Sequence, residues 1–211
     1  NAFALQASSA HLYRLRDNLV RGMRYDGPAL FCVYSGATET VPGVAPYLLA
    51  AAATESRAFP TFTYDPSAGD DWAGRFDLSE NPQLEAGWPS HQFEYEDAQG
   101  QRFDAQAAFS FFDLAVCDTR YARYCAPVAR ADWNDRMVPA VEWLEYSPER
   151  RLNFVPYVYG VDAENRLLRS GVAEKLIEAA RRCQDAWRRL QELAGINNSH
   201  ALRLLAAERR N

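Results

Sequence analysis

Hydrophobic positions near the start of the chain follow first a helical and then a continuous spacing. Leucines and a methionine recur every three or four residues over 12–25, which predicts an amphipathic helix with Ser8 or Ser9 as its cap. Residues 29–34 (ALFCVY) are apolar without interruption. Runs of this kind are typical of parallel strands that helices cover on both faces. The pattern therefore predicts a helix followed by a buried strand.

The next segments repeat this order. An alanine-rich stretch over 47–57 predicts a helix, with Pro46 at its first turn, and residues 61–64 predict another strand. Two strands joined by a helix are by default parallel, with a right-handed crossover. Residues 29–64 are therefore expected to form a parallel strand–helix–strand unit, and the protein to belong to the α/β class.

The middle of the chain is less regular. Residues 65–90 are rich in proline and glycine and predict a long ordered connection held by aromatic side chains. Polar and apolar residues alternate over 91–97, as in a strand with one buried face. Residues 105–116 are expected to be helical, and a shorter helical stretch is expected at 121–125.

The last part has the clearest pattern. Residues 154–161 and 166–172 predict the two strands of a hairpin. A long helix is expected over 173–194, with a short helix after a cap at 197–199. Spacings of three and four place a heptad seam on the long helix, formed by Ala173, Leu176, Ala180, Cys183, Trp187, Leu190 and Ala194. Three ion pairs at i,i+4 are expected on its outer face, namely Glu178–Arg182, Asp185–Arg189 and Arg188–Glu192.

Composition limits the class of protein. The chain has 211 residues, of which 48% are hydrophobic, enough for a packed core and too many for a disordered chain. It has no apolar run of membrane-spanning length, so no membrane partner is expected. We divide the chain into an α/β unit over 1–70 and an α+β extension over 71–211 that packs on it. Asn1 and Ala2 resemble the remnant of a cleaved tag, which suggests a piece of a longer protein.

Charge and cysteines narrow the picture further. The net charge is −5, and ten acidic residues between Asp65 and Asp104 argue against binding to nucleic acid. The four cysteines have no CxxC spacing and lie in apolar segments, as expected of reduced thiols in a cytoplasmic protein. They are Cys32, Cys117, Cys125 and Cys183.

Few residues carry the pattern of a known chemistry. Ser35 and Gly36 follow a predicted parallel strand, where α/β proteins place ligand-binding loops. His91, Glu94 and Glu96 contain metal-ligating groups, but on a strand His91 would face away from the two glutamates. A metal site is therefore not expected there.

Two further acidic positions have a structural interpretation. Asp113 lies in a segment crowded with phenylalanines, so its carboxylate must be paired if it is buried. We expect its partner to be Arg120 or Arg123. Asp70 and Asp71 precede a tryptophan and are expected to form a cap or turn.

The segment from Tyr25 to Ser35 reads YDGPALFCVYS and resembles the end of the thiamine-diphosphate domain of pyruvate:ferredoxin (flavodoxin) oxidoreductases. In that family a helix leads into a strand of the type YxGPSLIIAYSPC, and a further helix and strand end in a YDP-like turn. Matching segments follow at 50–60 (AAAATESRAFP) and 62–66 (FTYDP). A closer likeness, to large fused 2-oxoacid:acceptor oxidoreductases, extends through 72–76, 81–83 and the tail from Asn197.

The resemblance implies a parent enzyme that decarboxylates a 2-oxo acid oxidatively on thiamine diphosphate and magnesium. Electrons would leave through iron–sulfur clusters to ferredoxin or flavodoxin. The GDG…N motif that holds the metal and the diphosphate in that family is absent from this sequence. The family strand ends in Tyr-Ser-Pro-Cys, with the cysteine on a cluster, whereas this chain has Tyr34-Ser35-Gly36-Ala37. The chain alone is therefore expected to bind none of these cofactors, with Ser35 and Gly36 near a cofactor or cluster of the parent.

The resemblance leads to a first hypothesis about function. The chain would be the C-terminal region of such an oxidoreductase, cytoplasmic, oligomeric in the parent and without a complete active site of its own. Its role would be structural, at the interface with the remainder of the parent and with ferredoxin or flavodoxin.

Two alternatives stay open. The chain could be a non-catalytic module that docks an acidic redox partner through Arg181, Arg182, Arg188 and Arg189. It could also be a free-standing enzyme for a small molecule that uses His91 or Asp113.

Overall fold

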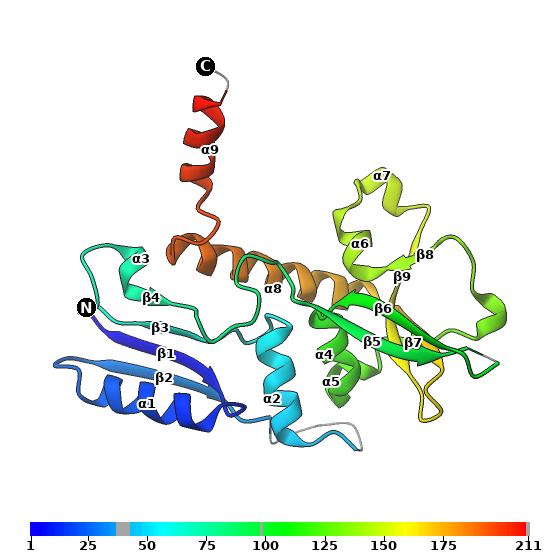
Figure 1. Ribbon diagram of the computed structural model, residues 1–211, viewed down its shortest axis with the longest axis horizontal. Coiled ribbons are helices and arrows are strands. Elements are labelled where there is room, and N and C mark those ends of the chain that lie inside the picture. Colours follow the sequence, from blue (N-terminus) through cyan, green and yellow to red (C-terminus); the bar gives the residue numbers. More distant parts are fainter. Residues whose placement is uncertain (37–42, 98, 210–211) are drawn as a thin grey trace.

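A computed structural model describes residues 1–36, 43–97 and 99–209 of the protein. Its first part contains strands and helices in alternation, followed by a short helix and strand (Figure 1). They are β1 (Phe3–Ser8), α1 (Leu12–Met23), β2 (Ala29–Tyr34), α2 (Pro46–Glu55), β3 (Phe62–Tyr64), α3 (Trp72–Arg75) and β4 (Phe76–Asp77).

The second part consists of short strands and helices and ends in two longer helices. They are β5 (Ser90–Glu96), β6 (Arg102–Ala108), α4 (Phe111–Cys117), α5 (Thr119–Ala122), β7 (Cys125–Pro127), the 3-10 helix η1 (Arg130–Asp132), β8 (Met137–Pro139), α6 (Ala140–Glu145), α7 (Pro148–Arg151), β9 (Val155–Val161), β10 (Leu167–Val172), α8 (Glu174–Leu193) and α9 (Ser199–Glu208). The predicted α/β class, the hairpin and the long C-terminal helix are confirmed.

The first sheet has the strand order β2-β1-β3-β4. The predicted order of strand, helix and strand over 29–64 is present, but β2 and β3 do not pair with each other. Instead β1 lies between them, parallel to β2 and antiparallel to β3. The parallel crossover therefore runs from β1 through α1 to β2. The reason is that Phe3, Leu5 and Ala7 of β1 are fully buried and occupy the centre of the sheet.

The second sheet has the order β7-β10-β9-β8. β9 and β10 form the predicted hairpin, and β8 adds in parallel to β9. A separate hairpin of β5 and β6 lies beside this sheet (Figure 1), with Phe93 5.7 Å from Tyr159 between ring centroids. The predicted helix over 105–116 is wrong at its start, because β6 continues to Ala108 and α4 begins only at Phe111. The predicted helix at 121–125 is instead α5, which ends three residues earlier and is followed by β7.

Helix α8 crosses the middle of the molecule and packs against both α4 and α6 (Figure 1). Its predicted seam is confirmed at Leu176, Ala180 and Trp187, which are buried. Leu176 and Ala180 share one apolar core with Leu49 of α2 and Phe112 of α4. None of the three predicted ion pairs on the outer face closes to within 4.0 Å among the described residues.

Arg57 forms hydrogen bonds with residues 82–87, the segment that precedes β5. Its side chain is 1% exposed, and its guanidinium carbon lies 4.0 Å from the centroid of the Trp187 ring. It donates hydrogen bonds to the carbonyl oxygens of Pro82 (2.6 Å), Gln83 (3.2 Å) and Gly87 (3.3 Å). Burial lowers the pKa of Arg57 to about 10, so the guanidinium keeps its charge at neutral pH. The connection is therefore ordered, as predicted.

Strand β2 and helix α9 are among the surfaces that leave apolar side chains in solvent. Strand β2 is an edge strand, and Leu30 and Val33 on it are exposed. Helix α9 projects away from the body (Figure 1), begins at the predicted Asn198 cap, and buries none of its residues. Among the described residues, none of the helices is both long and apolar enough to cross a lipid bilayer. All four cysteines are free thiols.

Candidate functional site

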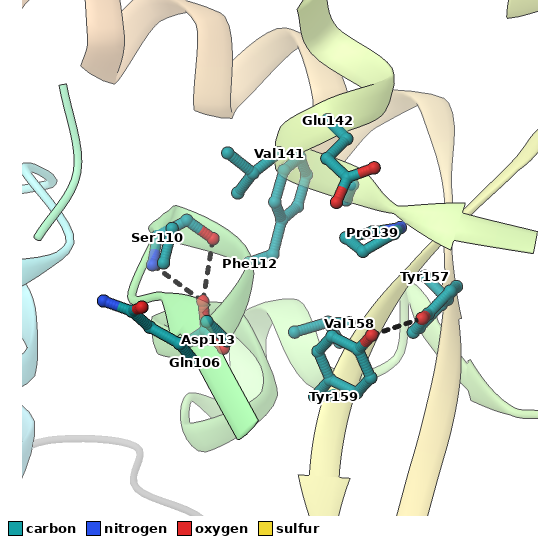
Figure 2. Close-up of a pocket in the computed structure, with 13 residues that line it drawn as sticks. Gln106, Ser110, Phe112, Asp113, Pro139, Val141, Glu142, Tyr157, Val158 and Tyr159 are labelled. Atoms are coloured by element: carbon teal, nitrogen blue, oxygen red, sulfur yellow. Dashed lines mark hydrogen bonds between the residues drawn. The ribbon is translucent and has the colours of Figure 1, made fainter. Parts of the chain in front are cut away.

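A cavity of about 180 Å³ opens between β6, α4, α6 and β9. Figure 2 shows that Asp113, Glu142 and Tyr159 surround the same space although each comes from a different element. Gln106 and Ser110 add further polar groups, and Phe112, Pro139 and Val141 supply apolar wall. The cavity therefore combines convergent polar side chains with an apolar lining, as small-molecule sites do.

The start of α4 positions Asp113. Ser110 is the N-cap of the helix, and Asp113 is its third residue, so the two form a capping box. The backbone N–H of Ser110 donates to Asp113 Oδ2 at 2.7 Å, and the Ser110 hydroxyl donates to the same oxygen at 2.8 Å. The backbone N–H of Asp113 itself also favours the charged carboxylate, and in the part of the chain that the structure describes no other residue bonds to Oδ1. One oxygen of Asp113 is thus fixed and the other is free for a ligand.

Burial changes the acidity of this carboxyl group. Desolvation raises the pKa of Asp113 to about 6, against the two hydrogen bonds from Ser110, which favour the charged form. A carboxyl group with such a pKa exchanges its proton near neutral pH, as general acids and bases do. Asp113 is therefore the group in this cavity best suited to proton transfer.

Two tyrosines from β9 form the opposite wall. Because residues two apart on a strand face the same side, Tyr157 and Tyr159 lie next to each other, and the Tyr157 hydroxyl donates to the Tyr159 hydroxyl at 2.7 Å. Burial, followed by this bond, raises the pKa of Tyr157 above its ordinary value. The guanidinium carbon of Arg169 lies 4.4 Å from the ring centroids of Tyr157 and Trp133. Tyr159 keeps its own hydroxyl proton and can donate it into the cavity.

A second cavity of about 200 Å³ adjoins the first and shares Asp113 and Tyr159 with it. Its walls are more apolar, with Phe93 from β5 and Phe109 before α4. His91 stands at this cavity, and its Nε2 lies 2.8 Å from an oxygen of Glu55 at the end of α2. The pair of cavities thus has a polar end and an aromatic end.

The predicted loop at Ser35 and Gly36 lies elsewhere, at the carboxyl end of β2. Ser9 donates its hydroxyl to the Ser35 carbonyl at 3.0 Å. Gly36 has a φ of +66°, and a Cβ there would stand 2.2 Å from the carbonyl oxygen of Pro46. A side chain is therefore excluded at Gly36 for steric reasons, whether or not a ligand binds. The remainder of the predicted loop, 37–42, lies outside the described residues.

A cavity of about 340 Å³ lies near this end of β2 and is lined by Tyr34, Asp118, Arg120 and Arg182 among others. Asp118 and Arg120 form a bidentate ion pair, with the shortest N–O distance at 2.5 Å. The iron–sulfur cluster that the resemblance implies does not fit here. Cys183 is the one cysteine in the lining, and no three His, Cys, Asp or Glu side chains within 1–36, 43–97 and 99–209 could together hold a metal ion.

Other sequence predictions fare differently. On β5, His91 lines the second cavity while Glu94 and Glu96 line a different one, in keeping with their predicted opposite faces. The arginine partner predicted for Asp113 is wrong, because the capping box at Ser110 satisfies the carboxylate locally and Arg120 pairs with Asp118. The predicted cap is confirmed at Asp71, which accepts from the Gly74 N–H at 2.7 Å.

Sequence reasoning missed three residues of the cavity, namely Glu142, Tyr157 and Tyr159. The spacing of the two tyrosines on a predicted strand was a usable signal, since it places both hydroxyl groups on one face. Glu142 gave no local signal, because only the packing of α6 against β9 brings it to this space.

Comparisons with models of known protein families, with curated proteins and with solved structures return no match for this chain.

Proposed function

We propose that the chain is the C-terminal region of a 2-oxoacid:ferredoxin (flavodoxin) oxidoreductase of the large fused type. Its role there is structural: it completes an α/β domain and forms an interface, and it holds no complete active site. Thiamine diphosphate, magnesium and iron–sulfur clusters belong to the remainder of the parent. The resemblance over residues 10–66 supports this proposal, and one feature of the fold carries it.

That feature is the free edge of β2. A continuous apolar run is expected to be buried on both faces of a parallel sheet. Among the described residues β2 pairs on one side only, with β1, and Leu30 is 67% exposed and Val33 45% exposed. Long, flat apolar edges invite pairing with another strand, and stable proteins cover them. A further strand from the parent, with its covering helices, accounts for this surface.

Helix α1 adds to the same surface. Leu12, Tyr13 and Met23 on α1 are all more than half exposed, while Leu15 faces the sheet and is buried. The apolar face of α1 is therefore wider than the part that the sheet covers, and its ends remain exposed. An uncovered part of an amphipathic face is a surface that another element can bury.

The test is the reading frame that encodes the chain. The proposal expects it to extend upstream of Asn1 and to encode the GDG motif of a thiamine-diphosphate site together with cysteine pairs for clusters. A start codon directly before this sequence would contradict the proposal. The complete protein is then assayed for reduction of ferredoxin or flavodoxin by pyruvate and other 2-oxo acids.

A second measurement addresses the isolated chain. Thermal unfolding is followed with and without thiamine diphosphate and magnesium. No shift is expected, because the motif that holds them is absent from the sequence. A shift of several degrees would show a ligand bound to the folded state and would contradict the assignment of a purely structural role.

The docking of an acidic redox partner is a second candidate, favoured by the outer face of α8. Arg181, Arg182, Arg188 and Arg189 are exposed, and none of them forms an ion pair with a described residue. Unpaired surface charge steers oppositely charged partners, and salt screens that attraction. Titration with ferredoxin should therefore give tighter binding at low salt than at high salt. Binding that is absent, or indifferent to salt, would sink this candidate.

A further inference from the structure

We infer that the two adjoining cavities around Asp113 form a binding site for a small organic ammonium ion that carries an aromatic or branched apolar group. The inference is independent of the proposed function. The cavities lie in the part of the molecule built from β5, β6, α4, α6 and β9, whereas the free edge of β2 lies at the other end (Figure 1).

The charge of the cavity lining selects a cation. Two carboxylates, Asp113 and Glu142, line the first cavity, and neither cavity is lined by a lysine or an arginine among the described residues. His91 is the one basic side chain in the lining, and it lies against Glu55. Carboxylates without a counter-ion in a partly desolvated site attract a cation strongly. Asp113 and Glu142 would repel an anionic ligand, and Arg169 lies behind the Tyr157 ring.

Free acceptor groups select a hydrogen-bond donor. Oδ1 of Asp113 receives no hydrogen bond from another described residue, although Asp113 is partly buried. Figure 2 shows Glu142 on the other side of the same space, on the first turn of α6. A primary ammonium group has three N–H donors, which suits two carboxylates and the amide oxygen of Gln106.

The second cavity determines the rest of the ligand. Phe93 and Phe109 line it together with Val161, and it joins the first cavity at Asp113 and Tyr159. The two volumes, about 180 and about 200 Å³, together fall in the range of small-molecule sites, roughly 300–1,000 Å³. An ammonium at the polar end can thus place an attached ring among the phenylalanines, where burial of apolar surface adds affinity.

Calorimetric titration of the protein with 2-phenylethylammonium chloride tests the inference. The two reference probes are 2-phenylethanol, which has no charge, and 3-phenylpropanoate, which is an anion. The site should bind the ammonium at least about tenfold more tightly than the alcohol and should not bind the anion, since hydrogen bonds to charged groups are stronger than those between neutral groups. Equal affinity for the ammonium and the alcohol, or no binding of the ammonium, would overturn the inference.

Matched variants locate the binding. Glu142→Gln should weaken the ammonium at least about fivefold, whereas Glu145→Gln, which removes a charge from the same helix outside both cavities, should leave the affinity unchanged. Phe93→Ala should weaken 2-phenylethylammonium but not methylammonium. Because both glutamates are exposed, neither variant is expected to disturb the fold. Equal losses in the two glutamate variants would place the cation elsewhere and contradict the inference.

Discussion

The two sheets of this protein differ in how completely the chain buries them. Around the second sheet, Leu176 and Trp187 of α8 and Phe112 of α4 are at most 1% exposed. In the first sheet, β1 is equally buried, but its neighbour β2 leaves Leu30 67% exposed. Both regions have apolar sequences, and two helices pack against each sheet, α1 and α2 against the first and α4 and α6 against the second. The difference lies at the edge strand β2, which has no outer partner among the described residues.

In the second region, helices of the same chain pack against the sheet. Helices α4, α6 and α8 pack together beside the sheet, and Arg57 and Trp187 fasten the preceding connection to them. The first region has α1 on one side of β1 and β2, and its edge strand has no further partner in the described chain. A cavity with convergent side chains occurs in the second region, although Val155 and Leu168 on its strands are also exposed. The most exposed large apolar side chain on a described strand, Leu30, lies on the free edge of the first region.

The largest expected contrast compares two leucines. Leu176→Ala empties a fully buried position and should lower the free energy of unfolding by about 2–5 kcal/mol. Leu30→Ala changes an exposed side chain and should alter it by at most about 0.5 kcal/mol. Urea denaturation of both variants measures the difference. Similar losses would mean that the edge of β2 is covered in solution by the chain itself or by a second copy.

The next effect concerns Asp113. Its pKa is about 6 in the folded protein and about 4 in an unfolded chain, so the folded state binds the proton more tightly. The free energy of unfolding should therefore fall as the pH rises from about 4 to about 6, by up to about 3 kcal/mol. Asp113→Asn keeps an acceptor for Ser110 and should remove this slope.

Asp118→Asn is the control for the pH series. Burial alone would raise the pKa of Asp118. Hydrogen bonds from Arg120 nevertheless hold this pKa below its ordinary value. Asp118 therefore stabilises the fold above about pH 4, and its contribution is lost on acidification. The slope assigned to Asp113 should persist in Asp118→Asn. If it disappears there and survives in Asp113→Asn, the assignment is wrong.

The smallest expected effect is the difference in stability loss between alanine substitutions at two glycines of the first region, Gly36 and Gly43. Gly36→Ala should cost about 2–3 kcal/mol, because it combines a positive φ with a contact of 2.2 Å to Pro46. Gly43→Ala has a φ of +91° but open space around the new Cβ, so about 1 kcal/mol is expected. Thermal unfolding of both variants compares them, and equal shifts would show that the contact at Gly36 relaxes freely.

Local sequence signals predicted much of the second region. The hairpin at 154–172 and helix α8 depend on spacing within single segments, and the structure has both. The capping residues Asp71 and Asn198 were likewise identifiable from their neighbours. Predictions failed where pairing with a distant segment determined the secondary structure. Residues 105–108 have the alanines of a helix, but pairing with β5 makes them the end of β6.

In the first region, too, local spacing was informative, whereas strand pairing was not predictable from single segments. The predicted strand–helix–strand unit over 29–64 did not include β1, although Phe3, Leu5 and Ala7 have the alternating spacing of a strand. Without β1, the parallel partner of β2 could not be assigned correctly. The candidate cavity was largely beyond sequence reasoning, since Asp113 and Glu142 meet only through the packing of α4 and α6 around β9.

Hydrogen exchange at β2 tests the central claim, that a larger protein covers this edge. The bonds from Phe3 N to Pro28 O and from Ser9 N to Tyr34 O set the pattern of the ladder, which directs the N–H groups of Phe31 and Val33 to the free side. In the 211-residue chain these amides should exchange rapidly. In the full-length protein from the complete reading frame they should be protected at least about a hundredfold more. Equal exchange in the two proteins would contradict the account.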